Sequence, residues 1–188
     1  MINKAERNRE KIIDAAMQLF YEHGFNQTSF KDVSEATGIP KGNFYYYFKS
    51  KDDLLKAVID ERRQWLRLRL QEWHKQSDDP RERLKFIVSL MQDSAENASQ
   101  HGCPIGSLNA ELTKNNEAML AIARGMFDLL LEWAEEQLRA MGKGDESRDL
   151  ALHILAMSQG SILMGSVYHD RDLLLRESNR LRDYLDTL

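Results

Sequence analysis

The chain has 188 residues, of which 42% are hydrophobic, so it can bury a core and is not an intrinsically disordered chain. Its 3 prolines and 10 glycines fit a helical protein better than a loop-rich β-protein. A single cysteine excludes an intrachain disulfide framework and fits a reducing, cytoplasmic location. The charged N-terminus lacks the apolar stretch of a signal peptide, so we expect none.

The charge is unevenly distributed along the chain. The formal net charge is −4, but residues 1–51 carry 8 Lys/Arg and 6 Asp/Glu, whereas the remainder carries 18 and 24. A mildly basic head therefore precedes an acidic body, which is compatible with a chain that binds DNA through one face only.

Residues 4 to 23 predict an amphipathic helix. Gly24 follows it as a helix terminator. The apolar residues recur at helical spacing and define one face: Ile12, Ile13, Ala16, Leu19 and Phe20. We expect this helix to support the segment that follows.

Residues 28 to 51 predict two short helices around a tight turn. Ser29 is a helix cap with Asp32 three residues later, and Gly38 supplies the left-handed residue that ends a helix. Pro40 stands where a second helix can begin, because its missing N–H is not needed there. Two helices joined by a short Gly-containing turn form a helix-turn-helix.

The second helix, about Pro40 to Phe48, predicts a face with the chemistry of DNA recognition. Its first turn can attract phosphate, Asn can pair with adenine, Lys can contact phosphate or guanine, and Tyr can contact phosphate or a thymine methyl group. Phe44 and Phe48 are expected to pack inward. The candidate DNA-binding residues are Ser29, Lys31, Lys41, Gly42, Asn43, Tyr45, Tyr46, Tyr47 and Lys51. On this pattern alone, a small aromatic core with solvated lysines is an equally good interpretation.

Two stretches resemble the TetR family of transcriptional regulators. They are PKGNFYYYFKSKDDLL and KIIDAAMQLFYEHGFNQTSFKDVSEATG, within residues 7 to 60. The residues that fit the family pattern are Ala15, Leu19, Phe20, Gly24, Phe25, Gly38, Lys41, Gly42, Tyr45, Phe48 and Lys51. Tyr47 departs from it, because the family often has His there. The resemblance implies a homodimeric repressor that binds a palindromic double-stranded DNA operator and is released by a small ligand.

Residues 50 to 100 predict two longer helical segments. Ser50 caps the first, which runs to about His74 and resembles the family's connecting helix. QSDDP at 76–80 is a linker. Asp79 and Pro80 then begin a helix that is expected to continue to about Gln100.

Residues 101 to 188 predict a broken segment followed by three helices. HGCPIGSL interrupts the helix, and Ser107 can cap a short one. Asn115 or Asn116 caps a helix over about 117–141, whose apolar arc is too wide for one buried face. Residues 150–169 contain no Asp, Glu, Lys or Arg, so we expect burial on nearly all sides. Their polar and small residues argue against membrane insertion.

The helices at about 117–141 and 148–168 are expected to form the homodimer interface as a four-helix arrangement. This assignment agrees with the way in which the TetR family dimerises through its last long helices. A final helix over about 170–187 is expected to cover the body.

No pattern indicates an enzyme, a cofactor or a metal site. The histidines at 23, 74, 101, 153 and 169 are scattered, and no phosphate loop, nucleophile elbow or apolar carboxylate pair is present. Cys103, near His101, is either a buried space-filler or a thiol that senses electrophiles.

An effector pocket is expected between the central helices of the body. Taken singly, each candidate residue fits plain core better than ligand contact: Trp65, Phe86, Met91, Cys103, Met126, Phe127, Trp133, Met157 and Tyr168. Because no charged residue stands out as a counter-ion, we expect a small, uncharged, apolar or aromatic effector.

The sequence therefore predicts an all-α protein of about nine helices. Residues 1–50 form a helix-turn-helix DNA-binding domain, and residues 51–188 form a helical ligand-binding and dimerisation domain. The expected function is sequence-specific transcriptional regulation in the cytoplasm, as a ligand-released repressor that does not enter the membrane. The alternative is a helical ligand-binding or scaffold protein whose helix-turn-helix makes only protein contacts.

Overall fold

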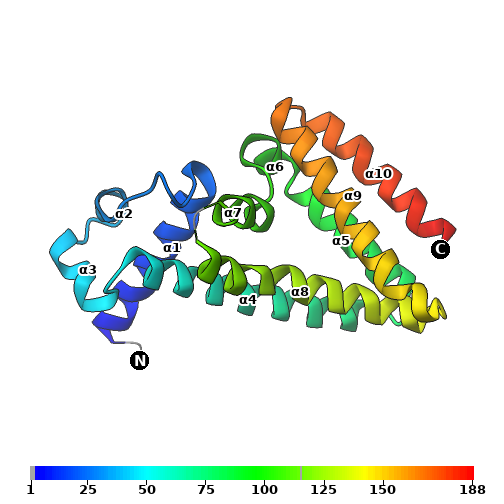
Figure 1. The fold of residues 1–188 in the computed structure, drawn as a ribbon, viewed down its shortest axis with the longest axis horizontal. Coiled ribbons are helices and arrows are strands. Elements are labelled where there is room, and N and C mark those ends of the chain that lie inside the picture. Colours follow the sequence, from blue (N-terminus) through cyan, green and yellow to red (C-terminus); the bar gives the residue numbers. More distant parts are fainter. Residues whose placement is uncertain (1–2, 115) are drawn as a thin grey trace. The chain divides into compact units, whose positions relative to one another are not determined.

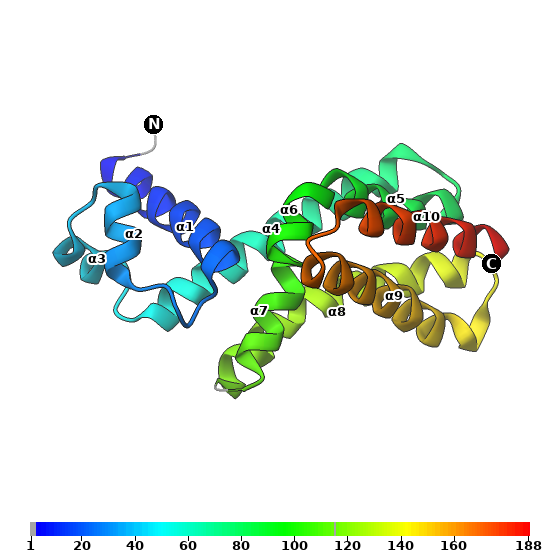
Figure 2. The ribbon, with the colours of Figure 1, turned by 90° about the horizontal axis from the view of Figure 1, so that it is seen from above.

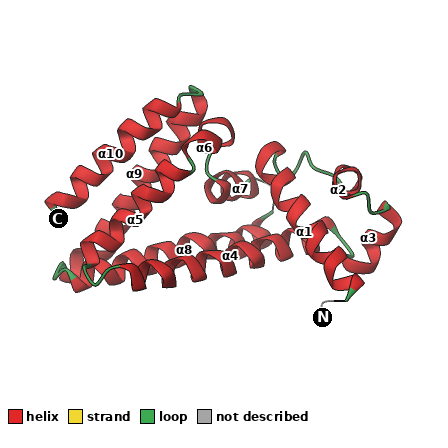
Figure 3. Ribbon diagram, turned by 180° about the vertical axis from the view of Figure 1, so that it is seen from behind, coloured by secondary structure: helices red, strands yellow, loops and turns green. Residues whose placement is uncertain are grey.

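The structure is a computed structural model that describes residues 3–114 and 116–188. These residues form ten α-helices and one short 3-10 helix, with no strand among them (Figures 1 and 3). The all-α prediction is confirmed. The predicted number of about nine falls one helix short, because the helix expected over residues 80–100 is two helices.

The helices follow one another with short connections. In chain order they are α1 (Lys4–His23), α2 (Phe30–Thr37), α3 (Lys41–Tyr47), α4 (Lys51–Gln76), α5 (Pro80–Asp93), α6 (Ala95–His101), α7 (Pro104–Leu112), α8 (Glu117–Ala140), η1 (Gly144–Glu146), α9 (Ser147–Val167) and α10 (Arg171–Thr187).

The chain divides into two compact units. Unit 1 contains the described residues up to Gln64 together with Ser107–Gly125, and unit 2 contains Trp65–Gly106 and Met126–Leu188. This division differs from the predicted boundary after residue 50. The first half of α4 carries buried Leu54, Leu55, Val58 and Ile59, so it contributes core side chains to unit 1.

In unit 1, α1 has the predicted bounds and buries the predicted face. Ile12, Ile13, Ala16 and Phe20 are buried along it. At its start, the Asn3 side chain accepts a hydrogen bond from the backbone of Glu6, whose carboxylate accepts one from the backbone of Asn3. This reciprocal pair satisfies two amides that the helix itself cannot satisfy.

Side-chain caps begin the later helices of unit 1 as expected. Before α4, the backbone of Ser50 donates to Asp53, and the backbone of Asp53 donates to the Ser50 hydroxyl, at 3.1 and 3.0 Å. Before α8, the Asn116 side chain accepts from the backbone of Met119 at 3.1 Å. Of the two predicted caps of α8, Asn116 is confirmed, while Asn115 lies outside the described residues.

In unit 2, α5, α9 and α10 lie side by side around one apolar core (Figure 2). Helix α5 ends at Asp93, and α6 begins two residues later. At the break, the Ser94 hydroxyl donates to the carbonyl of Leu90 at 2.7 Å. Such a bond competes with the helical backbone ladder, which gives a local reason for the interruption that sequence periodicity missed.

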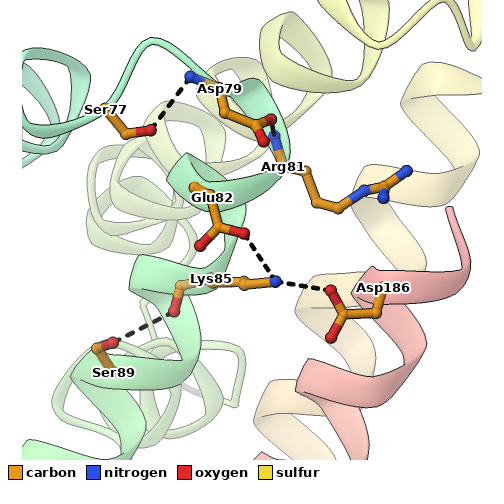
Figure 4. A network of polar contacts seen from close by, with 7 residues as sticks. All are labelled: Ser77, Asp79, Arg81, Glu82, Lys85, Ser89 and Asp186. Atoms are coloured by element: carbon orange, nitrogen blue, oxygen red, sulfur yellow. Dashed lines mark hydrogen bonds and ion pairs between the residues drawn. The ribbon is translucent and has the colours of Figure 1, made fainter.

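Polar side chains join α5 to α10 (Figure 4). The Lys85 ammonium donates to Glu82 at 2.8 Å and to Asp186 at 2.6 Å. These bonds, first that to Asp186 and then that to Glu82, raise the pKa of Lys85 above its ordinary value. Asp79 caps α5 as predicted, by accepting from the backbone of Arg81 at 2.8 Å.

Helix α9 leaves one apolar side uncovered. The described residues include one helix that is long and apolar enough to span a membrane, Gly144–Val167. Its most apolar window of 18 residues has a mean hydropathy of 1.4, and only 33% of that window is buried. The expectation that the segment is buried on nearly all sides is therefore wrong for a single chain. The exposed large side chains on and just after α9 are Leu152, Leu163, Met164, Val167 and Tyr168.

Helix α8, by contrast, buries much of its wide apolar arc within its own chain. Met126, Leu130, Leu131, Trp133 and Ala134 are all buried. In the part of the chain that the structure describes, α8 carries none of the exposed large hydrophobic side chains. Of the two helices predicted to form the dimer interface, only α9 offers such a surface.

Candidate nucleic-acid interface

Helix α2 begins at a capping box that fixes the start of the helix-turn-helix. The Ser29 hydroxyl accepts from the backbone of Lys31 and Asp32 at 3.2 and 3.4 Å. In return, Asp32 accepts from the backbone and the hydroxyl of Ser29 at 2.7 and 2.8 Å. These bonds, the backbone bond first, lower the pKa of Asp32 below its ordinary value.

The turn between α2 and α3 has the expected glycine geometry. Gly38 lies in the left-handed region with φ 69° and ψ 10°, where a residue with a Cβ is strained. The Ser34 hydroxyl donates to the carbonyl of Ile39 at 2.7 Å, and the Lys11 ammonium donates to that of Thr37 at 2.7 Å. The turn is thus held from α2 and from α1.

Helix α3 is anchored by its phenylalanines. Phe44 is completely buried, Phe48 directly follows the helix and is also buried, and Phe30 of α2 lies against Phe44 with ring centroids 5.6 Å apart. Pro40 is the residue before the helix rather than its first residue, and it makes no side-chain cap. The predicted inward positions are therefore correct, and they determine which side of α3 faces solvent.

The solvent side of α3 carries most of the predicted DNA-binding residues. Lys41, Gly42 and Asn43 are exposed in the first turn. Tyr45 is 58% exposed and Tyr46 is 81% exposed, which is unusual for large aromatic side chains. This face combines a cation, an amide and two phenols, a set of groups that can bond phosphate oxygens and base edges.

Tyr47 is tied to α1 and is half-buried. Its hydroxyl accepts a hydrogen bond from the Asn8 side chain at 3.3 Å, and its ring meets Tyr46 edge-on with centroids 5.2 Å apart. Tyr47 therefore supports the ring of Tyr46, and its predicted contact with DNA stays a prediction.

Lys51 has a structural position that the sequence did not predict. Its ammonium donates to the carbonyls of Phe25, Thr28 and Asn26 at 2.9, 3.1 and 3.4 Å, and it lies 4.3 Å from the centre of the Phe25 ring. A lysine ammonium has three protons, and all three are used here. This geometry makes Lys51 part of the internal bonding of unit 1, and its contact with phosphate stays a prediction.

Ser29 and Lys31 lie at the edge of the candidate interface. The Ser29 hydroxyl is engaged in the cap of α2, and Lys31 is an exposed side chain 3.6 Å from Glu35. Exposed ion pairs of this kind are weak, so Lys31 can exchange its partner for a phosphate.

In unit 2, the predicted effector residues do not share one environment. Met91, Met126 and Trp133 are buried, and Phe86, Cys103, Phe127 and Met157 are half-buried. Trp65 and Tyr168 are exposed, at 53% and 65%. Apolar residue type alone does not tell which helix face is covered, and the effector contacts of all these residues stay a prediction.

Three aromatic rings form a cluster in unit 2. Trp73 stacks on Phe86 with centroids 5.7 Å apart and planes 13° apart, and it meets Trp133 at 5.5 Å. The Trp133 Nε1 is buried and has no hydrogen-bond partner among the described residues. Trp73 was missed by sequence reasoning, although its spacing from Leu66 and Leu70 on one face of α4 could have indicated it.

A polar cleft opens beside this cluster. It has a volume of about 490 Å³ and is lined by Gln76, Ser77, Glu82, Lys85, Phe86, Ser89 and Arg182. Of the predicted effector residues, the cleft includes only Phe86. Among the described residues, no group of three or more His, Cys, Asp or Glu could hold a metal ion.

Comparisons with known proteins cover both ends of the chain. Residues 12–58 match the family described as bacterial regulatory proteins of the tetR family. Residues 80–179 match the C-terminal domain described for LmrA/YxaF-like transcriptional regulators.

Individual relatives match over nearly the whole chain. An uncharacterized HTH-type transcriptional regulator in the lacX 3′ region of Lactococcus lactis subsp. lactis is 34% identical over 175 residues, which are 91% of this chain and 88% of that protein. The HTH-type transcriptional regulator LmrA of Bacillus subtilis (strain 168) is 28% identical over 184 residues, 95% of this chain and 96% of LmrA.

A solved structure shares the fold. The crystal structure of a TetR transcriptional regulator from Legionella pneumophila superposes with a TM-score of 0.84 at 25% identity, covering 100% of this chain and 97% of that chain. These relatives are transcriptional regulators rather than enzymes, in agreement with the absence of catalytic motifs.

Proposed function

Because the chain belongs to the TetR family of transcriptional regulators, we propose that it is a homodimeric repressor that binds a palindromic operator and is released by a small effector. The protein is a DNA-binding transcriptional regulator of the helix-turn-helix type. The observation that carries the proposal is the exposure of Tyr45 and Tyr46 on a helix whose other side is anchored by buried Phe44.

Each exposed group on α3 has a distinct role in the proposed complex. Lys41 neutralises a phosphate, and Asn43 pairs with the N6 and N7 atoms of an adenine. Tyr45 and Tyr46 donate to phosphate oxygens or contact a thymine methyl group. Ser29 and Lys31 add contacts with the DNA backbone from the start of α2, and Tyr47 orients Tyr46.

The homodimer is proposed to form through α9. Its exposed stripe includes the large side chains of Leu152, Leu163 and Met164, with small Ala156 and Gly160 between them. A Cβ placed on Gly160 meets nothing within 4 Å in its own chain, so a helix of a second copy can approach closely there. An exposed apolar stripe of this kind marks an interface, and a two-fold axis matches it with itself.

The effector is proposed to be a small, uncharged, aromatic molecule bound in unit 2. The support is the Trp73, Phe86 and Trp133 cluster, whose rings can stack on a planar ligand. The unpartnered Trp133 Nε1 can donate to an acceptor on such a molecule. An effector releases DNA only if it binds the DNA-free state more tightly than the bound state.

The proposed site of action is the bacterial cytoplasm, where the operator is accessible. This location is supported by the family and by the single, half-buried Cys103, which needs no oxidising compartment.

The test is binding to DNA that flanks the protein's own gene. We expect a discrete shifted complex in a gel-shift titration, with a dimer per operator and with affinity that decreases as salt increases. A chain that binds flanking DNA no better than a random duplex contradicts the proposal and favours the scaffold alternative.

A further inference from the structure

The backbone between α1 and α2 is held by a carboxylate from far along the chain. Glu111, on α7, accepts hydrogen bonds from the backbone amides of Phe25 and Asn26, at 2.9 Å to Oε2 and 2.6 Å to Oε1. Each oxygen of the carboxylate thus takes one amide. Hydrogen bonds to an ionised acceptor are about twice as strong as neutral ones.

The opposite side of the same backbone is held by Lys51. Its ammonium donates to the carbonyl of Phe25 at 2.9 Å. The Phe25 carbonyl and the Asn26 amide belong to one peptide group, so a single peptide plane lies between the Lys51 cation and the Glu111 anion. Two charges that bond opposite ends of one amide polarise it in the same direction, and each bond strengthens the other.

The surrounding geometry fixes this peptide plane. The Phe25 side chain is buried and meets Phe20 edge-on with centroids 5.2 Å apart. Gly24 has φ 86°, and a Cβ placed on it would lie 3.3 Å from the Glu111 carboxylate. Ser29, the cap of α2, follows Asn26 by only three residues. The position of this peptide therefore sets where the helix-turn-helix begins.

We propose that Glu111 is a positioning residue for DNA binding. Together with Lys51, it holds the Phe25–Asn26 peptide plane, and through that plane it holds α2 and α3 in the orientation that DNA requires. The inference rests on the proposed operator binding. It places a determinant of DNA affinity on α7, outside the helix-turn-helix.

The direction in which operator affinity changes when Glu111 loses its charge distinguishes a positioning role from a simple electrostatic effect. Removal of a negative charge from a DNA-binding unit should by itself strengthen binding to a polyanion. If Glu111 acts as a positioning residue, Glu111→Gln should instead weaken operator binding, by about tenfold, which corresponds to about 1.4 kcal/mol. Glu111→Asp keeps the charge but shortens the side chain, so it should weaken binding as well.

The experiment measures operator affinity by fluorescence anisotropy for the wild type, Glu111→Gln and Glu111→Asp. The control is Glu61→Gln, which removes the same charge from an exposed position on α4 in the same unit. We expect unchanged or slightly tighter binding for this control. Amide hydrogen exchange should become faster at Phe25 and Asn26 in both Glu111 variants, whereas it should stay unchanged in the buried core of α1.

Two results overturn the inference. The first is wild-type operator affinity in both Glu111 variants while exchange at Phe25 and Asn26 accelerates. The Glu111 hydrogen bonds would then hold the peptide without affecting DNA binding. The second is a wild-type rate of hydrogen exchange at these two amides in the Glu111 variants. The Glu111 hydrogen bonds would then not hold the peptide in place. A wild type that binds no operator is a different result, which refutes the proposed function itself.

The shared peptide plane is tested by a double-mutant cycle. The effects of Lys51→Met and Glu111→Gln on operator affinity should be non-additive, although the two charged groups bond different atoms. Lys51→Met combined with Glu61→Gln should be additive. Additive effects of Lys51→Met and Glu111→Gln would refute the coupling of the two bonds through the shared peptide. If Lys51→Met does not fold, the carbonyl carbon shift of Phe25 in Glu111→Gln reports the same polarisation at the end of the peptide that Lys51 bonds, and an unchanged shift refutes it.

Discussion

Phe30 of α2 touches both faces of α3: its ring lies 5.6 Å from that of Phe44, which is fully buried, and 5.8 Å edge-on from that of Tyr45, which is exposed. The same side chain therefore joins the anchored side of the recognition helix to its DNA-facing side. Rigid support of this kind is what allows a helix of seven residues to present its polar groups in a fixed geometry.

Phe44→Ala should destabilise the protein strongly. The substitution removes a fully buried aromatic side chain, and such changes cost about 3–5 kcal/mol. We expect the free energy of unfolding, measured by urea denaturation, to fall by that amount. Tyr46→Ala is the matched control on the same helix and should change it by less than about 0.5 kcal/mol. Equal losses in both variants would show that the assigned faces of α3 are incorrect.

Lys41→Ala should weaken operator binding and make it less sensitive to salt. Loss of one phosphate contact reduces the slope of log affinity against log salt concentration by about 1. The measurement is fluorescence anisotropy at several salt concentrations. Lys75→Ala, at an exposed position on α4 in unit 2, is the control and should keep the wild-type slope. An unaltered slope for Lys41→Ala removes this side chain from the interface.

Tyr46→Phe should weaken operator binding without affecting folding. The variant keeps the ring that meets Tyr47 but lacks the hydroxyl, so it removes one hydrogen bond to DNA worth about 0.5–1.5 kcal/mol. Tyr47→Phe should have a smaller effect, because that side chain is half-buried and its hydroxyl accepts a hydrogen bond from Asn8 of α1. Gel-shift titrations of the two variants compare them directly, and a larger loss for Tyr47→Phe would reverse the roles given to the two residues.

Asp32 should stabilise unit 1 at neutral pH and lose that effect in acid. Bonds from Ser29 hold the pKa of Asp32 below its ordinary value of 3.8, so the folded state favours the charged carboxylate. The stabilisation is present above the unfolded pKa and disappears as the pH falls through the folded one. Thermal melts of the wild type and Asp32→Asn should therefore differ at neutral pH and converge in acid. A difference that is constant with pH contradicts the capping role.

Gly160→Arg should convert the dimer into a monomer. A Cβ placed on Gly160 meets no atom of its own chain within 4 Å, so a side chain can leave this exposed position toward solvent, whereas a close neighbouring helix leaves no room for it. Sedimentation velocity should show half the mass of the wild type, with unchanged helical content by circular dichroism. Gln71→Arg, exposed on α4, is the control and should remain dimeric. A dimeric Gly160→Arg would place the interface elsewhere.

Local chemistry made much of this protein predictable from sequence. The caps at Ser29, Ser50 and Asp79 and the left-handed Gly38 act through bonds to neighbouring residues, so their effects are encoded within a few positions. The inward direction of Phe44 follows from helical periodicity for the same reason.

Tertiary structure alone decided which groups are free to act. Lys51 has the sequence context of a phosphate contact, but three carbonyls brought together by the fold occupy its ammonium. Trp65 and Tyr168 are residue types that often line pockets, but both are exposed in the part of the chain that the structure describes. Glu111 contacts an amide 85 residues away. Covering and long-range pairing depend on how the helices pack, and that information lies in no short stretch of sequence.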